Sequence, residues 1–190
     1  MKNSHQIKSN IKTKITLSLF ALSFVLISSA PKALASDVSV ENITYLLNKE
    51  RIYHGLSPFS LDTDLNHAAK NKSKDMLNRN YFDHYAYGLT PWDFINNAGY
   101  KYLYAGENLA MDFQTSEGMV NAWMNSPAHR KNILSEDFED IGIGVVKGAY
   151  VENGQEKETI LVSNMFARKK PVIVEIFNRI IDNIGILFSW

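Results

Sequence analysis

Apolar residues recur every three or four positions over much of the chain after residue 37, which is the spacing of one face of an α-helix. In the first such segment the recurring residues are Val40, Ile43 and Leu47. Gly55 and Gly99 follow two of these segments, and glycine is the residue that most often ends a helix. The pattern predicts helices over residues 38–51, 63–78, 91–98, 116–123 and 127–134.

The period changes to that of β-strands in the later part of the chain. Residues 141–146 and 159–166 each predict a strand. Between them, Asn153 and Gly154 supply the residue types that a tight hairpin turn needs. A run of helices followed by an antiparallel hairpin indicates an α+β domain.

Two segments between the predicted helices follow neither period. Residues 80–90 form a loop rich in aromatic side chains. Residues 100–111 mix aromatic and small residues, and Gly-Glu-Asn at 106–108 predicts a tight turn. Both segments contain polar groups that a core pattern does not require.

The first 35 residues have the pattern of a secretory signal peptide. Lysines precede an apolar run over 15–27, and Ala-Leu-Ala at 33–35 is a small-residue cleavage site. The run is shorter than the roughly 20 residues of a membrane span, so an uncleaved anchor is the lesser alternative. We therefore expect a protein that is secreted or associated with the cell envelope.

Removal of this segment changes the charge and leaves a chain without cysteine. The whole sequence has 20 basic and 20 acidic residues, and residues 1–35 hold five lysines and no acid. The remaining 15 basic and 20 acidic residues give a formal net charge of −5, which argues against nucleic acid as a partner. The absence of cysteine excludes disulfides, a thiol nucleophile and thiolate zinc sites.

Candidate chemistry gathers at His84 in the aromatic loop, at Glu107 and at His129. Ser126 and Pro127 suit the N-cap and first position of a helix, which places His129 in its first turn, where the helix dipole favours neutral imidazole. Two histidines and a carboxylate are ligands for a divalent metal such as zinc. No HExxH pattern supports that hypothesis, and a partly buried structural histidine is the alternative.

Other histidines and aromatic residues have simpler interpretations. His54 and His67 fit solvated surface positions. Aromatic side chains around the loop would line a groove for a lipid, glycan or peptide, or would pack in the core. Among them, Tyr85 and Tyr87 flank His84 and are the best candidates for exposed contacts.

Taken in order, several stretches resemble the CAP superfamily, also called the SCP or cysteine-rich secretory protein family. They read LLNKERIYHGLSPFSLDTDLNHAAKNKSKDM, NYFDH, AGENLA, AWMNSPAHRKNIL, FEDIGIGV and VSNMFA. The similarity covers about residues 40–168 and is greatest to the cysteine-free bacterial branch. It implies an α-β-α sandwich with a small antiparallel sheet between helical layers and one open cleft.

The resemblance also implies a cleft lined by two histidines and two acids. Matched motif by motif, His84, Glu107 and His129 take three of these places, and no acid follows Trp123 at the fourth. His84, His129 and Glu107 would hold zinc with an open position for water, but no second carboxylate is present to act as a general base. The first hypothesis is a binding module for a divalent metal or small ligand. The alternatives are a zinc-dependent hydrolase and an interaction scaffold.

The sequence predicts a boundary between a domain at 36–170 and a tail at 171–190. Wound as a helix, the tail places Ile173, Ile176 and Ile180 on an apolar side, opposite Glu175 and Asp182. Its charges argue against a membrane span. We expect this amphipathic helix to dock on a protein partner or on a membrane surface, while the cleft binds a small ligand, a lipid or a cell-wall component.

Overall fold

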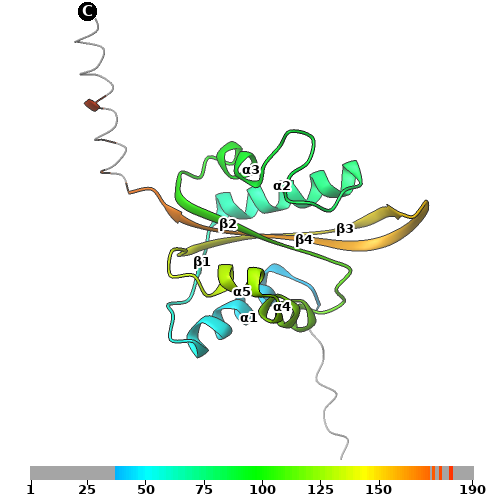
Figure 1. Ribbon diagram of the computed structural model, residues 1–190, viewed down its shortest axis with the longest axis horizontal. Coiled ribbons are helices and arrows are strands. Elements are labelled where there is room, and N and C mark those ends of the chain that lie inside the picture. Colours follow the sequence, from blue (N-terminus) through cyan, green and yellow to red (C-terminus); the bar gives the residue numbers. More distant parts are fainter. Residues whose placement is uncertain (1–36, 172, 174–175, 177–179, 182–190) are drawn as a thin grey trace, which may run out of the picture. The chain divides into compact units, whose positions relative to one another are not determined.

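The computed structural model describes residues 37–171 together with Ile173, Ile176, Ile180 and Ile181 (Figure 1). The described residues belong to one unit. The predicted signal peptide and most of the predicted helical tail lie outside the described residues. Within the described part, no helix has the length and apolar character needed to cross a membrane.

Five helices form where the apolar spacing predicted them, with shifts of up to two residues at their ends. Their first residues follow extended N-cap residues, and at Ser39 and Asp62 the cap side chain accepts a backbone N–H of the first turn. Thr90 and Asp93 form a reciprocal capping box before the third helix. The helices are α1 (Val40–Tyr53), α2 (Thr63–Arg79), α3 (Pro91–Asn97), α4 (Ser116–Asn125) and α5 (Pro127–Ile133).

Four strands form one mixed sheet in the order β1-β3-β4-β2. The strands are β1 (Ser60–Leu61), β2 (Tyr102–Met111), β3 (Asp140–Glu152) and β4 (Gln155–Lys169). The three long strands are antiparallel, as predicted, whereas the short β1 pairs in parallel with β3. The prediction of a purely antiparallel sheet is therefore wrong at β1, a two-residue strand too short to show a period.

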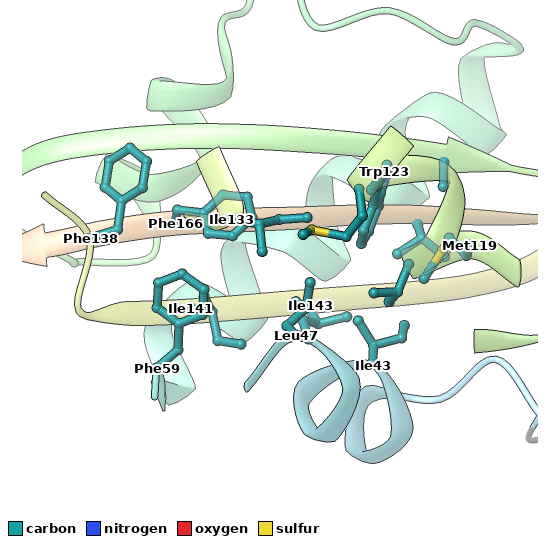
Figure 2. Close-up of a cluster of buried hydrophobic side chains, with 14 residues drawn as sticks. Ile43, Leu47, Phe59, Met119, Trp123, Ile133, Phe138, Ile141, Ile143 and Phe166 are labelled. Carbon is teal, nitrogen blue, oxygen red and sulfur yellow. The ribbon is translucent and has the colours of Figure 1, made fainter. Parts of the chain in front are cut away.

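Helices cover both faces of the sheet, so the predicted α-β-α sandwich is confirmed (Figure 1). Helices α2 and α3 lie on one face, and α1, α4 and α5 lie on the other. The larger core lies between the sheet and the layer formed by α1, α4 and α5. Fourteen buried apolar side chains pack together there (Figure 2). It includes Leu47 of α1, Trp123 of α4 and Phe166 of β4.

Glycines on β3 bring α2 unusually close to the sheet. A Cβ atom added at Gly142 would lie 2.0 Å from the backbone carbon of Leu65, and one at Gly144 would lie 2.2 Å from that of Ala69. No side chain fits in either space, because both neighbouring atoms belong to the helix backbone. The two glycines therefore set the position of α2 on the sheet.

The predicted tight turn at 106–108 is wrong, because these residues lie inside β2. Gly106, Glu107 and Asn108 pair with Phe166, Met165 and Asn164 of β4. Glycine, glutamate and asparagine are poor strand formers, so local sequence favours a turn while tertiary pairing favours the strand.

The predicted hairpin between 141–146 and 159–166 is confirmed, but both strands are longer than expected. Asn153 and Gly154 connect them with positive φ values of 52° and 77°, as the turn residues predicted. The extensions next to the turn are largely polar and exposed, so they carry no apolar period that would reveal them.

Candidate functional site

A buried carboxylate and a half-exposed imidazole form the centre of the site. Glu107 lies on the edge strand β2 with its side chain 1% exposed, whereas the His84 side chain is 42% exposed in the loop after α2. His84 Nδ1 lies 2.7 Å from Glu107 Oε2. The other carboxylate oxygen accepts a hydrogen bond of 3.0 Å from the hydroxyl of Ser163 on β4. Both oxygens of the buried Glu107 carboxylate thus have side-chain partners.

This pairing changes the protonation of His84. The hydrogen bond to Glu107 raises the pKa of His84 above its ordinary value, although partial burial acts in the opposite direction. The contact with Glu107 therefore favours the protonated form of His84 more than free imidazole would.

His129 is placed at the third position of α5, as the sequence predicted. Ser126 is its N-cap residue in extended conformation, but the serine side chain makes no capping hydrogen bond. Burial lowers the pKa of His129, and the positive charge of His84 lowers it further. The expected direction is confirmed, but its largest cause is desolvation. The pKa values of the two histidines are consequently shifted in opposite directions.

Two asparagines that the sequence analysis missed connect α5 to the edge strand. Asn108 Nδ2 donates to the carbonyl oxygen of His129 over 3.1 Å. Asn132 Nδ2 donates to the carbonyl oxygen of Glu107 over 3.1 Å and to Asn108 Oδ1 over 2.8 Å. These amides hold the helix that carries His129 against the strand that carries Glu107.

A buried lysine on α2 is a second residue that the sequence analysis missed. Lys72 is 0% exposed, and its ammonium contacts the loop that carries His84. Its position is seven residues after Leu65 and three after Ala69, on the face of α2 that points to the sheet. That spacing is the signal that identifies it, because an otherwise apolar face includes one charge.

The described residues contain no group of three or more His, Asp or Glu side chains that could hold a metal. Glu107 uses its oxygens for His84 Nδ1 and Ser163, which is the arrangement of a carboxylate that orients a ligating histidine from behind. A catalytic zinc ion uses three protein ligands, and the residues present fall short of that set. Zinc binding by His84 and His129 remains a prediction.

Other candidate residues fall where the sequence placed them. His54 and His67 are exposed, and His54 Nε2 lies 3.3 Å from a guanidinium nitrogen of Arg130. Tyr85 and Tyr87 are exposed beside His84, as expected. The end of α4 carries no acid after Trp123. The position at which the resemblance implies a second acid is therefore uncharged in this chain.

A groove of about 460 Å³ lies apart from these residues, between α1, α4 and α5. Its lining includes Leu46, Met124 and Arg130 but none of the three predicted site residues. The chemistry predicted from the sequence therefore does not lie in this groove.

The family model of the cysteine-rich secretory protein family, CAP, matches residues 44–165. Two curated relatives come from Bacillus subtilis: the uncharacterized protein YkwD, 43% identical over 129 residues, and the uncharacterized membrane protein YlbC, 32% identical over 132 residues. The matches cover 67% and 65% of this chain. The chain spans 47% and 38% of the lengths of these relatives, which is half or less.

Solved structures show the same fold. The crystal structure of an extracellular protein containing an SCP domain from Bacillus anthracis is 31% identical, with a TM-score of 0.58, over 68% of this chain and 40% of that one. An outer surface protein of Borrelia burgdorferi is 20% identical, with a TM-score of 0.56, over 72% of this chain and all of that one. With the family match over residues 44–165, these findings show that the chain belongs to the cysteine-rich secretory protein (CAP) family, although it contains no cysteine.

Proposed function

We propose that this chain is an exported binding module whose site at His84, Glu107 and His129 takes up a small polar ligand at the cell envelope. Export is supported by the signal-peptide pattern of residues 1–35. It is also supported by the similar chain from Bacillus anthracis, which is described as an extracellular protein.

The observation that carries the proposal is the pairing of His84 Nδ1 with the buried carboxylate of Glu107, 2.7 Å away. This pairing leaves Nε2 of His84 for a ligand, and Nε2 is a donor whenever the imidazole is protonated, which the raised pKa of His84 favours. Because the pKa of His129 is lowered, its imidazole stays neutral and offers a lone pair. A ligand with an acceptor or negative group for His84 and a donor for His129 matches both. Fragments of the cell wall, with carboxylate and amide groups, have this chemistry.

Exposed aromatic side chains next to His84 support a ligand larger than a single ion. Tyr85 is 60% exposed and follows His84 directly in the chain. Flat aromatic surfaces contribute apolar contact area beside polar groups that fix orientation. Zinc-dependent hydrolysis at the same site has weaker support, because the described residues supply fewer than three metal ligands.

The experiment is a calorimetric titration of soluble peptidoglycan fragments into wild type and a His84→Ala/His129→Ala double variant. His67→Ala is the matched control, because His67 is an exposed histidine on the neighbouring helix α2. Binding heat in wild type and control that is lost in the double variant supports the proposal. Equal heats in all three proteins contradict it.

A parallel titration with zinc chloride tests the predicted metal site. If His84 and His129 bind zinc, the double variant loses binding and wild-type affinity falls as pH drops through about 6.5, where free imidazole protonates. Equal zinc binding by wild type and the double variant contradicts the metal prediction and leaves the peptidoglycan result unaffected.

A further inference from the structure

Lys72 is a charged side chain in a place that charge normally avoids. It is 0% exposed on the inner face of α2, between Ala69 and Met76, which are also fully buried. Isolated charges are costly to bury, so a buried ammonium needs a full set of partners. The partners of Lys72 therefore indicate what the residue does.

All of its hydrogen bonds go to one short segment. Lys72 Nζ donates to the carbonyl oxygen of Asp83 over 2.8 Å, to that of His84 over 3.0 Å and to the hydroxyl of Tyr81 over 3.3 Å. An ammonium has three N–H donors, so this set uses its full capacity. The segment 81–84 is thereby attached to α2 at three points, and the last is the backbone of His84.

The Tyr81 hydroxyl is oriented for this contact. It donates to Asp75 over 2.6 Å, which leaves its lone pair facing Lys72. The ammonium also lies over the rings of Tyr81 and Phe94, 4.9 Å and 5.5 Å from their centroids. Aromatic faces attract a cation and partly replace its water shell.

Glu107 interacts with Lys72 through its charge. Burial lowers the pKa of Lys72, and the negative charges of Glu107, Asp75 and Asp83 oppose that change. The hydrogen bonds of Lys72 go to the loop, while those of Glu107 go to His84 and Ser163. The charge of Glu107 thus acts on Lys72, while both carboxylate oxygens remain with His84 and Ser163.

We propose that Lys72 is a positioning residue for the candidate site: its buried ammonium fixes the backbone of segment 81–84, so that His84 meets Glu107 and presents Nε2 to a ligand. This role rests on the proposed function of the site at His84, Glu107 and His129. Without the ammonium, three acceptors lose their donor and the loop is free to carry His84 away from Glu107.

The test reads the hydrogen bond itself, by NMR of the protein labelled with ¹⁵N-histidine. A proton held between His84 Nδ1 and a buried carboxylate exchanges slowly with water and gives a far-downfield signal. We expect Lys72→Met to lose this signal and Lys74→Met to keep it, because Lys74 is exposed on the same helix. A folded Lys72→Met protein with an unchanged signal overturns the proposal.

A milder variant covers the case in which Lys72→Met does not fold. Tyr81→Phe keeps the ring and removes one of the three acceptors of Lys72. Hydrogen bonds to charged groups are strong enough that its loss is expected to speed amide exchange at residues 82–84 by about tenfold. Unchanged exchange at these amides overturns the proposal.

Both measurements are made without any ligand. A failed titration with peptidoglycan fragments would therefore contradict the proposed function and leave the role of Lys72 in placing His84 standing. An unchanged His84 signal in Lys72→Met would contradict the role of Lys72 and leave the proposed function standing.

Discussion

Two buried cations lie on opposite sides of the sheet, and both bind loop carbonyls. Arg51 of α1 is 3% exposed, and its guanidinium donates to the carbonyl oxygens of Ile133, Ser135 and Phe138 and to that of Ser57. Lys72 of α2 is likewise buried and donates to segment 81–84. Each helix thus provides a cation whose N–H groups donate to the backbone carbonyl oxygens of an irregular loop.

The two loops differ in what they carry. The segment held by Arg51 begins and ends with core side chains, since Ile133 and Phe138 are both buried in the larger core. The segment held by Lys72 ends at His84, a half-exposed side chain of the candidate site. The planar guanidinium reaches carbonyls that approach from several directions, whereas the compact ammonium suits acceptors that converge. Arg51 is therefore a buried charge that supports the core, whereas Lys72 is a buried charge that supports a surface site.

The largest expected effect is the loss of Arg51. Arg51→Met leaves buried carbonyls without donors and should lower the free energy of unfolding by about 3–5 kcal/mol. Denaturant unfolding measures this loss, with Arg79→Met as the control because Arg79 is exposed. The histidine NMR signal of His84 should persist under native conditions. A loss below about 1 kcal/mol would remove the distinction drawn between the two cations.

Glu107 comes next, because it is the buried counter-charge on the Lys72 side. Glu107→Ala removes the acceptor of His84 and Ser163 and should cost about 1–3 kcal/mol. Glu107→Gln keeps the shape and one acceptor and should cost less. Thermal melts of both variants and wild type measure which substitution costs more stability. If both melt like wild type, the buried pair does not contribute to stability.

A smaller effect is the pH dependence of stability, with opposite signs for the two histidines. The folded-state pKa of His84 is raised, so its contribution is present below about pH 6.5 and is lost as pH rises through the folded pKa. The folded-state pKa of His129 is lowered, so its protonation opposes folding as pH falls below about 6.5.

Unfolding free energies of wild type, His84→Gln and His129→Gln, measured between about pH 5 and 8, test these signs. Relative to wild type, His84→Gln should lose most at the acid end, and His129→Gln should gain there. Each difference should stay below about 1 kcal/mol, because both side chains are only partly buried and water screens their charges. Parallel pH profiles for the two variants would contradict the opposite pKa shifts of His84 and His129.

The smallest effect is expected for removal of the tail at 171–190. Ile173, Ile176 and Ile180 are each at least half exposed. Removal of residues 171–190 should change stability by less than about 0.5 kcal/mol while abolishing any dimerisation or liposome binding. Melting, sedimentation and liposome flotation of a chain that ends at Lys170 test this. A large fall in melting temperature would show that the tail belongs to the domain.

The sequence predicted the sandwich because helical spacing and hairpin chemistry are local signals. It missed Lys72 although it predicted the helix at 63–78, whose buried face includes Leu65, Ala68 and Met76. A lysine is normally assigned to solvent, and only the partners on another loop make its burial possible. It missed β2 for a related reason, since pairing with β4 overrides residue preferences at Gly106 and Asn108.

For the site, the resemblance identified His84 and Glu107, but their protonation could not be predicted from spacing. Which nitrogen faces the carboxylate depends on the placement of the loop, and the pKa of His84 rises because this nitrogen, Nδ1, is hydrogen-bonded to Glu107 at 2.7 Å. At His129 the helix position gave the correct direction, whereas the main cause, burial, depends on tertiary packing.

The close packing of α2 on Gly142 and Gly144 has a consequence for how the site tolerates mutation. The two glycines lie against the helix backbone at Leu65 and Ala69, about two turns and one turn before Lys72. A methyl group at either position has no space, so the helix must move, and the lysine and the loop that carries His84 move with it. Random mutagenesis scored by binding should therefore recover inactivating changes in the interior of the sheet, at positions that no ligand can reach. Loss of binding at such a position would identify a change in the support of the site and not a contact with the ligand.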